Sequence, residues 1–537
     1  MKITLKIVAT GAAILLILAI VVRFYGSDFV AKKLNTHFEK LTESSYAIGY
    51  QSLETSILPP GVTIRGLTIS PRDSLQPKPF LIKGNLLIPN ISATQISVQG
   101  ISLVGLLFKD EIVVSQVGLD SLIIKTTLLS DKDSTEAIQL NAAGEGTDMK
   151  VEIRQLSLLS NEFFLFDAVN DSISKEITHG TINAELQNLI PFSLNDQEEL
   201  VSDGIIKLTR FRYLTPDGLY KLQLDSASLD WRAESLALSG FHLIPQYPKY
   251  EFALKKGHQV GRNEVDCQSI TAQKISFPLL MKGELLSIST LNFDSLVGNF
   301  YRDKRLDRPE NEPAKPLPHE SLLSSSLPFD IDSIVISNSR VAYQEVSKKG
   351  TAEGEISFDR LSATIANIKS NSNEYATLKA RTFLFDQGLL QTEIRIPMNP
   401  DSLYHVSGSV APMKMAAFNR ILTNVVFISI ESGDLEELKF NFSHNRTNSW
   451  GELSLLYQNF EVSGTDQARD NSDNVFQDVK LWLFNKLILR KSNEMETARN
   501  GQINADRQIK KSVFAFWWHS LLSGIKQCIN PFEKPKE

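Results

Sequence analysis

From Tyr46 to about Phe300 apolar and polar residues alternate with a period of two, and this pattern restricts the fold more than any other feature. Tyr220, Leu222 and Leu224, for example, alternate with polar residues. Such alternation indicates strands with one buried face and one solvated face. A parallel α/β sheet would show continuous apolar runs separated by helices, and that pattern does not occur here. We therefore expect a mainly β protein built from meandering antiparallel sheet.

Three segments share a weak repeat: two apolar residues, a glycine, then two further apolar residues. The segments are Val62–Ile69, Ile96–Leu103 and Leu236–Leu243, and their glycines are Gly66, Gly100 and Gly240. The step across the glycine is three residues, which in a regular strand would move the second pair to the opposite face. A bulge or bend at the glycine would keep both pairs on one face and curl the strand. The alternative is that each glycine belongs to an ordinary hairpin turn.

Length, charge and cysteine content narrow the possible classes of protein. A chain of 537 residues is too long for one compact core, but a repeating architecture avoids that limit because each unit covers only its neighbours. The net charge of −6, without large basic clusters, argues against nucleic acid as a partner. Cys267 and Cys528 lie far apart, so neither a disulfide framework nor a thiolate metal site is expected.

An uncharged apolar run from Ile7 to Val22 lies between Lys6 and Arg23. It is slightly shorter than the ~20 residues that a bilayer span needs, but the flanking charges can reach the interfaces. A cleaved signal peptide is the alternative, and no convincing small-x-small cleavage site follows the run. We expect residues 1–26 to be a single-pass anchor in the inner (cytoplasmic) membrane. The N-terminus would lie in the cytoplasm and the body in the periplasm.

Composition and periodicity divide the remainder into regions. Residues 27–45 are expected to form a membrane-proximal helix, in which Val30, Leu34, Phe38 and Leu41 share one side. The regions that follow are a β-rich region (46–301), a Pro-rich connector (302–328), a second β region (329–470) and a C-terminal helical cap (471–537). The cap contains an aromatic helix from Ser512 to Lys526.

The residue constellations that mark enzymes are missing. The eight histidines are far apart, and the sequence has neither a G-x-S-x-G elbow nor a phosphate-binding G-x-x-x-x-G-K loop. We therefore predict no catalytic residue, no cofactor and no metal ligand.

The two ends of the chain resemble a known family. The matching segments are Gly66–Pro71, Phe418–Leu422, Ile430–Leu435, Phe440–Phe442 and Gly451–Val462. They resemble AsmA-like proteins, bacterial relatives of TamB and of chorein-type bridge-like lipid transfer proteins. The resemblance implies an elongated, curved antiparallel β-sheet gutter with an apolar inside, an N-terminal transmembrane helix and short C-terminal helices. Arg210 and Arg212 depart from it, because they interrupt a strand that should line an apolar groove.

The resemblance implies phospholipids as partners and a role in outer-membrane biogenesis. An apolar gutter removes acyl chains from water, at about 0.8 kcal/mol per buried methylene, without fixing one headgroup. The residues expected to line it are Ile64, Val98, Leu222, Leu238, Phe358, Phe442 and Leu455. The alternative function is a non-transporting envelope scaffold that binds protein partners.

The aromatic C-terminal helix has two interpretations. Trp517 and Trp518, near Lys510 and Lys511, could contact a membrane interface or a partner, which would be the outer membrane or an envelope protein. The same residues could instead cover the open end of the sheet, whose edge otherwise invites aggregation.

Overall fold

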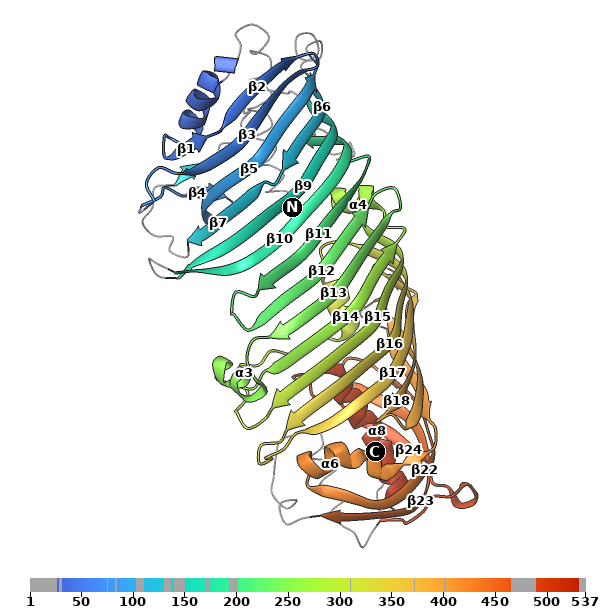
Figure 1. Cartoon of the computed structure of the whole chain (residues 1–537). Coiled ribbons are helices and arrows are strands. Elements are labelled where there is room, and N and C mark those ends of the chain that lie inside the picture. The colour runs from blue at the N-terminus through green and yellow to red at the C-terminus, as the bar shows by residue number, and fades with distance from the viewer. Residues whose placement is uncertain are drawn as a thin grey trace. The chain divides into compact units, whose positions relative to one another are not determined.

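A computed structural model describes most of the chain (Figure 1). The described residues are 27–28, 31–74, 76–82, 85–102, 111–129, 137–139, 150–169, 173–192, 201–309, 311–370, 372–399, 402–464 and 489–530. The chain divides into two compact units, Met1–Ser239 with Ser276–Lys282, and Gly240–Ile275 with Gly283–Glu537. Strand β13 (Ser235–Pro245) contributes to both.

The first unit is built around a β-sheet. Its strands are β1 (Tyr46–Gly49), β2 (Ser52–Ile57), β3 (Pro60–Pro71), β4 (Phe80–Ile82), β5 (Asn85–Ile101), β6 (Glu111–Asp120), β7 (Ile123–Leu129), β8 (Ile138–Gln139), β9 (Lys150–Val169), β10 (Ile173–Phe192), β11 (Asp203–Leu214) and β12 (Tyr220–Asp230). From β9 to β12 neighbouring strands pair antiparallel in chain order. Strands β6 and β7 lie end to end and together fill one position in the sheet. Both pair with β5 on one side and with β9 on the other.

The helix expected after the N-terminal run is present over residues 31–41. Leu34 is buried, and Phe38 packs against a small cluster of Tyr46, Phe80 and Ile138. The helical spacing in the sequence therefore identified the correct buried side. A short helix, α4 (Phe277–Lys282), also belongs to this unit, where Phe277 stacks on Trp231.

The second unit contains the remaining strands. They are β14 (Gly261–Gln273), β15 (Leu286–Asp303), β16 (Phe329–Val346), β17 (Gly354–Lys369), β18 (Tyr375–Leu384), β19 (Gly388–Pro397), β20 (Tyr404–Val410), β21 (Met413–Lys414), β22 (Ile428–His444), β23 (Asn448–Gly464) and β24 (Gly501–Asp506). Its helices are α3 (Lys249–Lys256), α5 (Pro318–Leu323), the 3-10 helices η1 (Met415–Phe418) and η4 (Met495–Thr497), α6 (Asn419–Val425) and α8 (Val513–Ile529).

The expectation of purely antiparallel sheet is wrong, because β15 and β16 pair in parallel over their whole length. The 18 residues of β15 span roughly 60 Å. The segment 304–328 returns to the start of the next strand, which it can do because extended chain covers about 3.3 Å per residue. The first two residues of the expected Pro-rich connector, 302 and 303, still belong to β15, and the remaining segment is a crossover connection between two parallel strands. Parallel pairing also occurs between β9 and both β6 and β7, and between β4 and β8.

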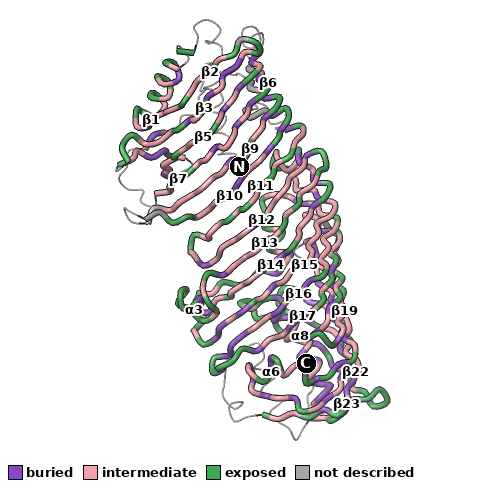
Figure 2. Tube along the Cα trace, viewed as in Figure 1, coloured by how far each residue is buried: buried purple, intermediate pink, exposed green. Residues whose placement is uncertain are grey.

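One large hydrophobic core closes the C-terminal part of the second unit. It joins β18–β23 to η1, α6 and α8, and it includes Leu317 from the connector. Buried residues accordingly concentrate around α8 and β22 in Figure 2. The sequence correctly predicted α8, whose first turn is capped by the Ser512 hydroxyl. It missed β24, which lies inside the segment expected to be helical.

The bends expected at the repeated glycines are confirmed, and the hairpin alternative is wrong. Gly66, Gly100 and Gly240 all have positive φ angles, of 61°, 68° and 63°, and each lies inside a continuous strand. In β3 the buried residues step from Ile64 to Leu67 across the glycine. A left-handed residue thus keeps both halves of a long strand on the same face, as the spacing of three requires.

The expected anchor at Ile7–Val22 lies outside the described residues. Among the residues that the structure describes, no helix is long and apolar enough to cross a membrane. The expected region boundaries at 301/302 and 328/329 both fall within the second unit. The division into functional regions stays a prediction.

Candidate functional site

The sheet of the first unit has one apolar face and one polar face. Cross-strand partners share a face, so the registers define rows that run across the strands. One row is Ile64, Ile96, Leu119, Leu158, Ala184, Ile206 and Leu229, and the next is Val62, Val98, Val117, Leu156 and Leu186. The row between these two consists of Thr63, Ser97, Gly118, Ser157 and Glu185, and it lies on the other face. We call the first two rows and their continuation past the bends the apolar face.

Burial along the apolar face decreases from the early strands to the late ones. On β3 to β10 most of its residues are buried, as Val98 (1% exposed) and Leu186 (4% exposed) illustrate. On β11 and β12, Ile206, Leu208 and Leu229 are half-buried. The accessible part of the apolar face therefore lies on β11 and β12.

Arg210 and Arg212 do not interrupt the apolar face. Arg210 has a left-handed backbone (φ 56°) and takes the place that glycine has in β3. The apolar series steps from Leu208 to Phe211 across it, so the two arginines point to the polar face and are exposed. There the Arg210 guanidinium donates hydrogen bonds to Glu162 (3.0 Å) and to Thr181 (2.8 Å).

Asn161 on β9 is a buried polar side chain whose hydrogen-bonding groups both have partners. The amide oxygen of Asn161 accepts from the backbone N–H of Leu122 at 2.9 Å, and its amide nitrogen donates to the carbonyl of Leu119. These bonds supply partners for backbone groups that the break between β6 and β7 leaves without a strand partner. The asparagine is therefore structural.

The residues predicted to line a groove fall into two groups. Ile64, Val98 and Leu222 lie on the apolar face of the first unit, where Leu222 is the half-buried partner of Tyr213 on β11. Leu238 is half-buried in β13.

The other three predicted lining residues lie in the second unit. Phe442 and Leu455 are members of its hydrophobic core, and Phe358 packs against that core. Phe442 is 2% exposed and Leu455 is 4% exposed. Helix α8 packs against the strands that carry these residues or flank them, so this part of the sheet is filled by the chain itself.

Trp517 and Trp518 are both half-buried against the same core. The Trp517 indole N–H donates to Nε2 of His444 at 2.9 Å, and Nδ1 of His444 contacts the carbonyl of Asn445 at 2.9 Å. His444 is fully buried, and Tyr404 stacks on its ring. The exposed aromatic residue of α8 is instead Phe514, at 71%.

Helix α8 also covers the outer edge of the last strand. The backbone N–H of Gln502 donates to the Gln527 side chain at 2.9 Å, and that side chain donates back to the Gln502 carbonyl. The N–H of Asn504 donates to the Ser523 hydroxyl at 3.0 Å. Side chains of the helix thus occupy backbone groups that would otherwise be free to pair with another strand.

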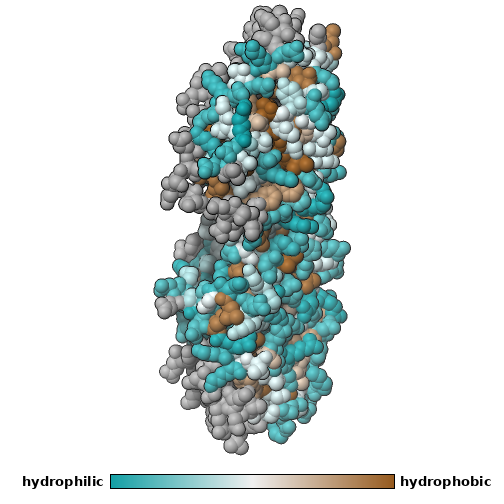
Figure 3. Space-filling model, turned by 60° about the vertical axis from the view of Figure 1, so that its left-hand side comes forward, coloured by the Kyte–Doolittle hydropathy of each residue, from teal (hydrophilic) through white to brown (hydrophobic). Residues whose placement is uncertain are grey.

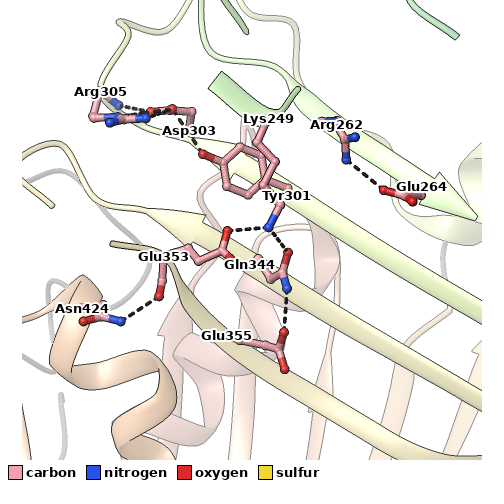
Figure 4. Close-up of polar contacts among 10 residues, drawn as sticks. All are labelled: Lys249, Arg262, Glu264, Tyr301, Asp303, Arg305, Gln344, Glu353, Glu355 and Asn424. Atoms are coloured by element: carbon pink, nitrogen blue, oxygen red, sulfur yellow. Dashed lines mark hydrogen bonds and ion pairs between the residues drawn. The ribbon is translucent and has the colours of Figure 1, made fainter. Parts of the chain in front are cut away.

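A polar network that the sequence did not reveal covers one end of β14–β17 (Figure 4). Lys249 of α3 contacts the carboxylate of Glu353 and the amide of Gln344, and that amide donates to Glu355. Asn424 of α6 donates to the Glu353 carbonyl at 2.7 Å. These contacts join helices α3 and α6 to strands β16 and β17, which indicates a structural role.

On the opposite side of the same strand ends lies a buried ion pair between Lys304 and Glu345, at 2.6 Å. Burial lowers the pKa of Lys304, with the charge of Glu345 acting in the opposite direction. Glu345 also accepts from the Tyr343 hydroxyl, whose pKa is raised by burial. Nearby, Glu312 of the connector lies within 3.8 Å of Arg302. These charges attach the connector to the sheet.

On the face drawn in Figure 3, hydrophobic residues form patches among hydrophilic ones. The chain matches no protein-family model, and no curated protein matches it.

Proposed function

We propose that this protein binds lipid acyl chains on the apolar face of its first unit, as an AsmA-like protein of the bacterial envelope would. The observation that carries the proposal is the pair of apolar rows, which cross strands β3 to β11 without a charged side chain. Such a surface gains free energy from every methylene that it removes from water, and it has no polar group to fix one position along the chain.

The mainly β architecture of both units is compatible with a bridge-like lipid transfer protein. The half-buried residues of β11 and β12 are the part of the apolar face that a lipid chain can reach first. In this proposal the segment Ile7–Val22 anchors the protein in the inner membrane, the body lies in the periplasm, and the protein supports outer-membrane biogenesis.

A scaffold that binds envelope proteins without carrying lipid is the second candidate. The hydrophobic core around α8 favours it, because among the described residues α6, η1 and α8 pack on the apolar side of the strands that form this core. The two candidates differ in which molecule should lie against β12.

Site-specific photo-crosslinking in cells tests the proposal. A benzophenone side chain at Leu229 would lie on the apolar face, and one at the adjacent Ser228 would lie on the polar face. We expect lipid adducts at position 229 and none at position 228, as judged by mass spectrometry of the purified protein.

The two positions differ by one residue on the same strand, so expression and folding should match. Protein adducts at position 229 in place of lipid would favour the scaffold. An absence of lipid adducts at 229, at Ile206 and at Leu222 would reject lipid binding on this face.

A further inference from the structure

The second unit has a hollow on the polar face of its sheet, opposite the hydrophobic core. The hollow has a volume of about 600 Å³ and crosses strands β16 to β20. Its lining consists of three rows of cross-strand partners. One outer row is Val335, Thr364, Lys379, Glu393 and Ser407, and the row next to it is Ile336, Ala363, Ala380, Thr392 and Gly408. The other outer row is Ser362, Arg381, Gln391 and Ser409, and Ser337 lies at its β16 end, where the register between β16 and β17 shifts.

Alternation along each strand places the two outer rows on one face and the middle row on the other. Thr364, Lys379 and Arg381 are exposed, whereas Ala363 between them is buried. The outer rows are therefore the walls of a trough, and the backbone of the middle row is its floor. We call this hollow the polar trough.

Several side chains of the polar trough have no partner, unlike their neighbours on the same face. Arg340 pairs with Asp359 and Glu355, and Lys439 pairs with Glu437. Within the described part of the chain, Arg381 and Gln391 make no side-chain hydrogen bond or ion pair, and neither do Ser362 and Ser409. Each of the four adjacent strands β17 to β20 thus has one side chain in the trough that can form hydrogen bonds and forms none within the described chain.

The chemistry of the walls selects among ligand classes. The guanidinium of Arg381 only donates, the carboxylate of Glu393 only accepts, and the Gln391 amide and the serine hydroxyls do both. A polyphosphate chain would have to lie beside Glu393, and an apolar ligand would gain little on a floor of peptide groups. An extended peptide would find no free strand edge, since β17, β18 and β19 are paired on both sides. A chain of hydroxyl groups matches the alternating donors and acceptors.

We propose that the polar trough binds a neutral, extended oligosaccharide chain. The five strands span about 19 Å between their outer members, at ~4.8 Å per strand, which accommodates about four sugar units lying across the strands. Each wall side chain then faces one sugar unit. This site lies on the opposite face of the sheet from the core and does not depend on lipid binding.

Titration of the full-length protein in lipid nanodiscs with chitohexaose, followed by saturation-transfer NMR, tests the proposal. The informative variant is the double substitution Arg381→Ala and Gln391→Ala, at two exposed positions. Arg395→Ala is the matched control, because Arg395 is exposed on the same face but stacks on Tyr375 outside the trough. We expect at least a tenfold loss of affinity in the double variant and no change in the control.

A second variant, Ser409→Trp, fills the trough and should also abolish binding, which protects the test if the double variant folds poorly. Maltohexaose, whose chain is curved, should bind more weakly than chitohexaose. The proposal is overturned if chitohexaose does not bind or if Arg395→Ala weakens binding equally. Displacement of the sugar by inorganic phosphate or by an extended decapeptide at equal concentration would overturn it as well.

Discussion

His444 is held in its neutral form by burial, and its two hydrogen bonds fix which ring nitrogen carries the proton. Its Nδ1 donates to a carbonyl, which can only accept, and its Nε2 accepts from the Trp517 indole, which can only donate. Burial lowers the pKa of His444 to about 4, from its ordinary value near 6.5. Between pH 6.5 and pH 4 the His444 side chain therefore binds a proton in the unfolded chain but not in the folded chain. We expect stability to be full above pH 6.5 and to decline as the pH falls toward 4, by up to about 3 kcal/mol.

The substitution His444→Phe tests this expectation. It leaves the Trp517 N–H without an acceptor, which should cost about 1–3 kcal/mol at pH 7. It also removes the titrating group, so the loss of thermal stability between pH 7 and pH 5 should be smaller than in the parent protein. His37→Gln, on the exposed side of helix 31–41, is the control and should keep the parental pH dependence. An unchanged pH dependence in His444→Phe would show that other groups dominate.

Residue-level prediction from the sequence succeeded where spacing alone determines the structure. The interval of three residues around Gly66 predicted a bend because glycine readily adopts positive φ. The same interval around Arg210 (Leu208 to Phe211) carries the same information, but an arginine gives no signal for a left-handed conformation. Its charge therefore looked like a defect in the apolar face. The polar partners Glu162 and Thr181, which hold it on the other face, come from strands far away in the sequence.

At the scale of single elements, α8 protects the edge of β24. The double substitution Ser523→Ala and Gln527→Ala frees the backbone groups of Gln502 and Asn504 to pair with another chain. We expect the variant to form oligomers in solution while keeping its strand content. Light scattering coupled to size-exclusion chromatography would detect them. Lys526→Ala on the same helix removes a side chain of similar length without freeing the strand edge, and it should stay in the parental state.

The two interpretations of the aromatic helix can also be separated. Trp517 packs on the core and bonds to His444, so Trp517→Ser should destabilise the second unit by about 3–5 kcal/mol. Phe514 is exposed, so Phe514→Ser should change stability by less than about 0.5 kcal/mol. Thermal unfolding measures both effects. If Phe514→Ser folds normally but fails to complement a deletion strain, α8 docks on a membrane or a partner as well as covering the sheet.

Element types were predictable from periodicity, and pairing was not. The alternation of residues indicated strands over most of the chain, with β24 as an exception, and the cluster of prolines indicated an irregular segment before β16. Whether β16 then runs parallel or antiparallel to β15 depends on the path of the connector. That path is fixed by contacts such as the hydrogen bond from the Arg507 side chain to the Lys315 carbonyl, which join residues almost two hundred positions apart. Strand β24 was missed because it has only six residues, among which Ile503 is the one large apolar side chain.

At the scale of the whole molecule, the two compact units should unfold separately. The second unit has a large core of its own, and the first unit buries its residues in the rows of the apolar face. Chains of this size that contain several cores rarely unfold in one step. We therefore expect two transitions in calorimetry of the full-length protein.

Two substitutions assign the transitions. Val98→Ala removes two buried methyl groups in the first unit and should lower the midpoint of one transition, at a cost of about 1–3 kcal/mol. Gly524→Ala would place a methyl group 3.0 Å from Cβ of Leu453, where α8 meets the sheet, and should lower only the other midpoint. Phe514→Ser should move neither. A single transition that shifts with both of the first two substitutions would mean that the units fold as one cooperative body, and lipid binding could then be coupled across the whole chain.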